Sequence, residues 1–190
     1  MVKNNPPIGK ASLRSILPKP PYDIKAHESL IWLEESRTLH MYIAYTEGKT
    51  QEEMAIYMAI LNLRMAEYGP WANNIQLLFH PRVIRLYENP SIYAQHVSEM
   101  KALVNRINQS FKVVTHINIR IKVDYANFQQ MKLAASFLAL EKNWNLFYYF
   151  DGILRLIEID EQSILMRRLR GVYDRDFKVQ MKYCGWLCYI

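Results

Sequence analysis

The segment from Lys112 to Asp124 alternates between apolar and polar side chains, and this pattern restricts the fold more than any other feature of the chain. One set of positions is apolar or β-branched and consists of Val113, Thr115, Ile117, Ile119, Ile121 and Val123. The alternate set consists of Lys112, Val114, His116, Asn118, Arg120 and Lys122. A period of two is typical of a β-strand with one packed face and one wet face. The segment therefore predicts a half-exposed strand, and we expect antiparallel pairing around it.

Start signals and apolar spacing predict three helices. Thr50-Gln51-Glu52-Glu53 is a capping box, and the helix that it begins ends at Gly69-Pro70. The apolar residues of this helix form two stripes, Met54, Tyr57, Met58, Leu61 and Met65 on one side and Ile56, Ile60 and Leu63 on another. Because two stripes leave little polar surface, we expect a central, buried helix. A second helix begins at Asn89-Pro90-Ser91, and a third spans residues 127–143.

Apolar runs bounded by turn residues predict the remaining strands. They are expected at residues 39–46, 75–79, 82–87, 146–150, 153–159 and 177–183. Asp151-Gly152 lies between two of these runs and is a strong hairpin signal, because both residues tolerate positive φ. The predicted fold class is α+β, a mostly antiparallel sheet packed against about three helices, with an extended N-terminal arm.

The first 25 residues differ from the rest in composition. They contain five of the 8 prolines in the chain, and five Lys or Arg residues against the single acid Asp23. Four of the six net positive charges therefore lie in this segment. Proline fixes φ and removes a backbone donor, so regular structure is disfavoured there. We predict a flexible basic arm at residues 1–25 and a single globular α+β domain at residues 26–190.

Motifs for catalysis and for cofactors are missing from the sequence. There is no Walker loop, no dinucleotide fingerprint and no nucleophile elbow. Cys184 and Cys188 have no second pair with which to form a zinc site. The acidic cluster Glu158, Asp160 and Glu161 would suit a metal nuclease, but no lysine follows Glu158 at the usual two-residue spacing. We therefore expect a protein that is not an enzyme and has no cofactor or metal.

The sequence also predicts the compartment. No apolar run of about 20 residues predicts a membrane span, and no apolar core of a signal peptide is present near the N-terminus. Two cysteines are too few for a disulfide-stapled secreted fold. We therefore expect a reducing compartment, such as the cytosol or the interior of a particle.

Positive charge gathers in three places and predicts a polyanionic partner, because clustered cations bind phosphates by counterion release and lipid headgroups through the surface potential. The candidate residues are Lys3, Lys10, Arg14 and Lys19 in the arm, Lys112, His116, Arg120 and Lys122 on the wet face of the strand, and Arg167, Arg168 and Arg170 before Gly171. No run of aromatic residues interrupts the strand, so the sequence does not support stacking of bases on it. A solvated face that keeps charges for solubility would show the same pattern.

The arm also contains the motif Pro18-Lys19-Pro20-Pro21-Tyr22-Asp23. A basic arm, then a proline-tyrosine motif, then an α+β core without catalytic signatures resembles the rhabdovirus matrix proteins in order, size and charge. Lysine stands at position 19, where a PPxY motif ending at Tyr22 has proline.

The resemblance implies a non-enzymatic structural protein of the virion interior and host cytoplasm that associates with the membrane from one side. Such a protein self-associates, binds the anionic inner leaflet and the nucleocapsid or its RNA, and recruits host budding factors. Pro20, Pro21 and Tyr22 are the candidate motif for partners or self-association. The apolar tail supplies a second candidate for assembly, at Trp186, Leu187, Tyr189 and Ile190.

A second function class fits the same cations. A basic nucleic-acid-binding accessory protein, of the kind that viruses use in movement or silencing, needs the same clustered positive charge. The sequence alone leaves both classes open.

Overall fold

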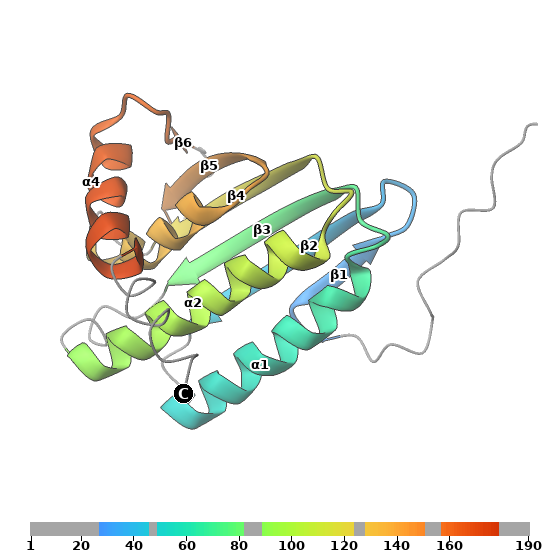
Figure 1. Cartoon of the computed structure of the whole chain (residues 1–190), viewed down its shortest axis with the longest axis horizontal. Coiled ribbons are helices and arrows are strands. Elements are labelled where there is room, and N and C mark those ends of the chain that lie inside the picture. Colours follow the sequence, from blue (N-terminus) through green and yellow to red (C-terminus); the bar gives the residue numbers. More distant parts are fainter. Residues whose placement is uncertain (1–26, 46–48, 82–88, 124–127, 151–156, 179–190) are drawn as a thin grey trace, which may run out of the picture.

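A computed structural model describes residues 27–45, 49–81, 89–123, 128–150 and 157–178. The core of this structure is a sheet of six strands in the order β1-β2-β3-β4-β5-β6 (Figure 1). The strands are β1 (Leu30–Leu33), β2 (Thr38–Tyr45), β3 (Asn74–Pro81), β4 (His116–Val123), β5 (Asn143–Phe150) and β6 (Ile157–Glu158). The spatial order follows the chain order, so each strand is laid down beside the one before it.

The sheet is mixed. Its two edge strands, β1 and β6, pair antiparallel with their neighbours, whereas β2, β3, β4 and β5 are mutually parallel. The α+β class and a sheet that includes antiparallel pairs are confirmed, but the expected antiparallel pairing around residues 112–124 is wrong. Alternation of apolar and polar residues indicates only that one face of a strand is buried and the other is exposed to solvent. The direction of pairing is decided by the helical crossovers, which return the chain to the same end of the sheet.

All the described helices lie on one side of the sheet. Helix α1 (Gln51–Tyr68) connects β2 to β3, and α2 (Pro90–Ser110) connects β3 to β4. The short helix α3 (Phe128–Met131) and the 3₁₀ helix η2 (Lys132–Ala139) connect β4 to β5. Right-handed crossovers that all step in the same direction along a sheet place their helices on the same face. This order therefore places no helix of the described residues on the other face (Figure 1).

The core lies between the sheet and these helices. One face of the sheet is buried along its central strands, and the largest contributions come from Leu39, Met41, Ile43, Ile75, Phe79, Ile117, Ile119 and Ile121. The helices oppose them with Met58, Leu61, Met65, Met100, Leu103, Ile107 and Phe137. The second helix turns one apolar face inward, because Val97, Met100, Leu103, Val104 and Ile107 are all buried.

Helix α1 begins and ends as the sequence predicts. The Thr50 hydroxyl accepts from the Glu53 amide at 3.2 Å, and the Glu53 carboxylate accepts from the Thr50 amide at 2.7 Å. At the other end a side chain on Gly69 would overlap the backbone carbonyl of Ser110, so the two long helices approach closely there. The expected central position is wrong, because Ile56, Ile60 and Leu63 are 53%, 45% and 59% exposed. Helix α1 packs against α2 along one side, and its second apolar stripe is exposed within the described residues.

Three predicted boundaries also change. Lys112–Thr115 precedes the strand, and Val114 is buried while Val113 is exposed. The third helix ends at Ala139 rather than Asn143, because the Asn108 side chain caps the turn by donating to the Ala139 carbonyl and accepting from the Glu141 amide. Phe177 and Lys178 belong to a helix rather than to a final strand.

That helix is η3 (Tyr173–Lys178), a π-helical turn that continues α4 (Ile164–Val172). The predicted pairing of residues 146–150 with 153–159 is confirmed in part, since Tyr148 pairs antiparallel with Ile157. The Asp151-Gly152 turn, the strand at residues 82–87 and residues 179–183 lie outside the described residues.

Candidate polyanion-binding surfaces

The uncovered side of the sheet, which we call the open face, presents side chains in cross-strand rows. Strand pairing defines three of these rows: Thr38, Asn74, His116 and Asn143; His40, Gln76, Asn118 and Asn145; and Tyr42, Leu78, Arg120 and Phe147. Lys122 and Tyr149 pair in the next row. The open face therefore combines amides, imidazoles, aromatic rings and two cations on a single surface.

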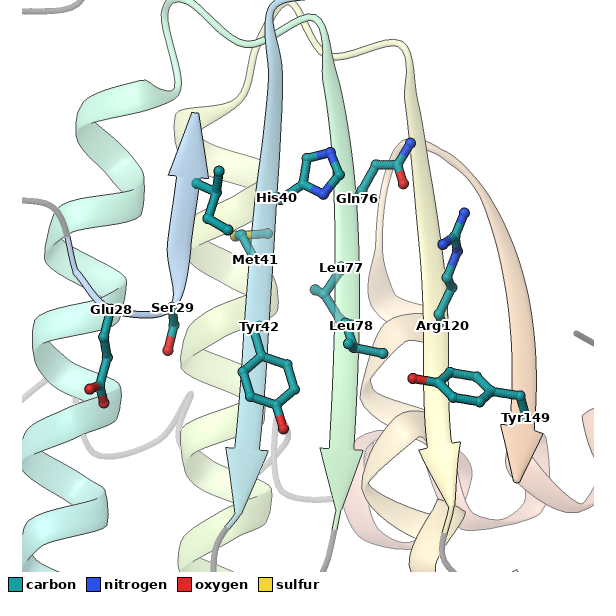
Figure 2. A pocket seen from close by; sticks show the side chains of 11 residues that line it. Glu28, Ser29, His40, Met41, Tyr42, Gln76, Leu77, Leu78, Arg120 and Tyr149 are labelled. Atoms are coloured by element: carbon teal, nitrogen blue, oxygen red, sulfur yellow. The ribbon is translucent and has the colours of Figure 1, made fainter. Parts of the chain in front are cut away.

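A hollow of about 460 Å³ lies on the open face. It is lined by Glu28, Ser29, Ile31, His40, Met41, Tyr42, Gln76, Leu77, Leu78, Arg120 and Tyr149. Figure 2 views the sheet from this side, with the helices behind the strands. His40, Gln76 and Arg120 stand from three adjacent parallel strands, and Tyr149 reaches from β5 across β4 toward Leu78.

The polar groups of the hollow fall into two classes. The Tyr42 hydroxyl is 3.3 Å from His80 Nδ1 and is held within the protein. In contrast, no hydrogen bond or ion pair joins the side chains of His40, Gln76 or Arg120 to any residue that the structure describes. Arg120 is exposed, and the other two are half-buried. These three side chains keep their hydrogen-bonding capacity for solvent or a ligand.

One end of the hollow is built differently. The Ser29 hydroxyl and the Tyr57 hydroxyl form a short hydrogen bond, and Tyr57 donates to the Tyr42 carbonyl at 3.2 Å. Burial raises the pKa of the Tyr57 hydroxyl, so it stays neutral. Burial also lowers the pKa of His27, whose ring lies 4.9 Å from that of Tyr57. Beside this neutral pair, the Glu28 carboxylate forms an ion pair with Lys49 at 3.5 Å, so the charges at this end of the hollow compensate each other.

The structure divides the predicted strand cations. His116, Arg120 and Lys122 lie at alternate positions of β4 on the open face. His116 Nε2 is 3.2 Å from Asn118 Oδ1. Lys112 does not belong to this set, because it follows α2 and its ammonium donates to the Asn108 carbonyl at 3.3 Å. Placing Lys112 on the open face was therefore wrong.

The arginine cluster lies in the helical layer and not on the open face. Helix α4 buries Met166, Leu169 and Val172, so Arg167, Arg168 and Arg170 are exposed. Arg170 pairs with Glu161, and the Arg168 guanidinium lies 5.7 Å from the centre of the Phe128 ring. The sheet cations and the helix cations therefore form two separate surfaces.

The remaining predicted site residues lie outside the described residues. They are Lys3, Lys10, Arg14, Lys19, Pro20, Pro21 and Tyr22 in the arm, and Trp186, Leu187, Tyr189 and Ile190 in the tail. Cys184 and Cys188 lie outside them as well. Their roles stay predictions.

Two members of the acidic cluster, Asp160 and Glu161, have structural partners. Asp160 accepts from the Gln162 amide at 3.0 Å and from the Ser163 hydroxyl through its carbonyl at 2.9 Å, so it shapes the turn into α4. Glu161 pairs with Arg170.

Within the described residues, no group of three His, Cys, Asp or Glu side chains is placed to hold a metal ion. Also within those residues, no helix is both long and apolar enough to cross a membrane.

Sequence reasoning missed the aromatic residues of the open face. Strand β4 itself has no aromatic residue, but pairing places Phe147 beside Arg120 and Tyr149 beside Lys122. The aliphatic Leu78 lies on the other side of Arg120. Each of these neighbours lies at an alternate position of its own strand, which is a signal available from the sequence. Which strands lie side by side, and in what register, was not available.

No protein-family model matches this chain, and no curated protein or solved structure is significantly similar to it.

Proposed function

We propose that this chain is a non-enzymatic structural protein of matrix type, which self-associates and binds an anionic membrane surface during particle assembly. The observation that carries the proposal is the outer side of α4, where exposed arginines accompany an exposed isoleucine. Under this proposal the protein works in the virion interior and the host cytoplasm, attached to the membrane from one side. The nucleocapsid and host budding factors are its further proposed partners.

The outer side of α4 suits an anionic bilayer. Ile164 is 65% exposed, and Arg167 and Arg168 follow it at helical spacing of three and four residues. Each cation near an anionic surface contributes about 1 kcal/mol, and the apolar side chain can enter the interfacial region. Buried Met166 and Leu169 anchor the opposite side of α4, so its exposed side keeps this orientation.

The exposed stripe on α1 supports self-association. Ile56, Ile60 and Leu63 run along two turns, and Ala59 between them is also exposed. The stripe carries no charge, so contact with water is unfavourable along its whole length. A second copy carries the same stripe, and a two-fold axis along it would bury both.

Vesicle binding tests the membrane part of the proposal. Arg167→Glu should weaken sedimentation with vesicles of phosphatidylserine and phosphatidylcholine by about tenfold at low salt, because one attraction becomes one repulsion. Arg106→Glu is the matched control, since Arg106 is exposed on α2 and the change in net charge is the same. Ile164→Ser tests the apolar contact without a charge change.

Equal losses for the two arginine variants would mean that net charge, not α4, drives binding. Binding of the wild-type protein to purely zwitterionic vesicles at the same level would contradict the role of anionic lipid. Circular dichroism of each variant checks that the fold is retained.

A second candidate function, a nucleic-acid-binding accessory protein, is favoured by the open face. Its combination of cations, amides and rings is typical of surfaces that bind single strands. This surface is distinct from α4, so the two candidates are tested by different variants.

A further inference from the structure

We propose that the hollow on the open face binds a base of a single-stranded nucleic acid, with the adjoining phosphate at Arg120. This inference rests on the second candidate function and names its site and ligand class. It is independent of membrane binding through α4.

The topology makes the surface available. Strands β2 to β5 run parallel and in sequence order, so their crossover helices all cover the other side of the sheet. In the described residues, Tyr42 on the open face is 42% exposed, while its neighbour Ile43 on the covered face is fully buried. An extended strand of nucleic acid needs such a broad face, because its bases must lie flat against protein side chains.

The hollow offers hydrogen bonds that no described residue takes up. His40 and Gln76 are directly paired in neighbouring strands, and Arg120 lies on the next strand, one row along. An amide offers both a donor and an acceptor, imidazole offers either, and guanidinium offers donors only. The edge of a base presents the complementary mixture of donors and acceptors.

Aromatic and aliphatic side chains form the walls. Tyr42 and Tyr149 line the hollow together with Leu78, and Tyr149 lies across β4 (Figure 2). Phe147 pairs with Arg120 at the margin. Bases stack on such rings irrespective of sequence, and a volume of about 460 Å³ lies in the range of ordinary ligand pockets.

The charges give the hollow a direction. At one end the Glu28 carboxylate is compensated by Lys49 at 3.5 Å, whereas Arg120 at the other end has no ion-pair partner among the described residues. Lys122 follows Arg120 by two residues on the same face of β4 and extends the positive edge. The phosphate backbone therefore runs along β4, and the base points toward His40 and β1.

Fluorescence anisotropy with a labelled, unstructured twelve-nucleotide RNA tests the proposal in the full chain. Arg120→Ala should weaken binding about tenfold and reduce the slope of log affinity against log salt by about one unit, as expected for loss of one phosphate contact. Tyr42→Ala should weaken binding by a similar factor without changing the slope, because stacking releases no counterion. Arg106→Ala on α2 removes the same charge from the helical layer and should change affinity less than twofold.

The competing occupants give different results. If the RNA binds through other cations, Arg120→Ala and Arg106→Ala will weaken it equally, and the proposal fails. If the hollow takes a free nucleotide rather than a strand, millimolar mononucleotide will displace the RNA fully, which also overturns it. Tighter binding of duplex RNA of the same length would also contradict the proposal, because paired bases cannot enter the hollow.

The vesicle assay separates this proposal from the membrane function. Arg120→Ala should leave binding to phosphatidylserine vesicles unchanged. Tyr42→Ala should weaken RNA binding by the same factor whether or not the protein also carries Arg167→Glu. If the wild-type protein binds vesicles but does not bind the RNA, this inference is wrong and the membrane function still stands. Thermal melting of each variant confirms that affinity changes do not come from unfolding.

Discussion

The two faces of the sheet are built from the same strands by alternate residues, yet they differ in every property that matters for function. On the covered face, Ile117, Ile119 and Ile121 of β4 are fully buried under the helices. On the open face, the intervening Asn118, Arg120 and Lys122 keep partial or full exposure. The covered face therefore supplies most of the stability, and the open face is free to carry ligand chemistry.

The difference arises from the connections and not from the strands. A chain that reversed its direction across the sheet would place helices on both faces and would need apolar residues on both. Here each strand lies next to the one before it in the chain, and the helices cover one face. Strand β4 can therefore lie in the middle of the sheet and still alternate between apolar and polar residues. A central parallel strand with a polar face indicates that its sheet is covered on one side.

The largest expected effect separates the two faces in one strand. Ile119→Ala should lower the free energy of unfolding by about 3 to 4 kcal/mol, because it opens a cavity in the packed core. Asn118→Ala, one residue away, should change it by less than about 0.5 kcal/mol. Urea denaturation measures both. Similar losses at the two positions would mean that the open face is packed in solution.

A smaller effect is expected on the outer side of the helical layer. Leu63→Glu should weaken self-association about tenfold, because it places a charge in an exposed apolar stripe. Because Leu63 is already 59% exposed, monomer stability should change little. Sedimentation velocity over a range of concentrations provides the measurement. Unchanged mass distributions for the variant and the wild-type protein would exclude α1 as the contact between copies.

The smallest effect concerns how η3 is held to the helical layer. The Tyr93 hydroxyl donates to the Asp176 carboxylate at 2.7 Å, and Arg175 donates to it as well. Partial burial raises the pKa of Asp176, but these hydrogen bonds and the positive charges of Arg175 and Lys132 together outweigh it, and the net pKa is lowered. Asp176 therefore contributes stability that is present above its unfolded pKa of about 3.9 and is lost as pH falls through the lower folded value.

Thermal melting between pH 6 and pH 2.5 tests this. The wild-type protein should lose more stability below about pH 4 than Asp176→Asn, which has no carboxylate to protonate. Tyr93→Phe removes one of the hydrogen bonds and should give an intermediate slope, with a loss of about 1 kcal/mol at neutral pH. Parallel acid profiles for all three proteins would show that the Asp176 contact does not form.

The elements that the sequence predicts correctly are those with a local signal. The capping box at Thr50 and Glu53, the start of α2 at Asn89-Pro90 and the alternation from His116 onward are all found where they were predicted. Each depends on residues within one or two turns of one another. The assignment of Lys112 to the strand was wrong because Phe111 and Val114 pack into the core before the strand begins.

The candidate sites show the same division. Arg120, Lys122 and His116 were predicted from alternation alone. That Arg167 and Arg168 lie on a separate surface depends on the packing of α4 against η2, far from β4 in the chain. The rings and amides near Arg120 come from β2, β3 and β5, so the sequence does not show that they adjoin it.

By itself, therefore, the sequence determined the types of most elements, the buried positions within them and the cations of β4. Local hydrogen bonding and the periods of helix and strand are enough for this. Only the tertiary structure decided the parallel pairing, the one-sided helical layer and the hollow on the open face. These depend on the direction of the crossovers and the register between strands, which are long-range properties of the packed chain.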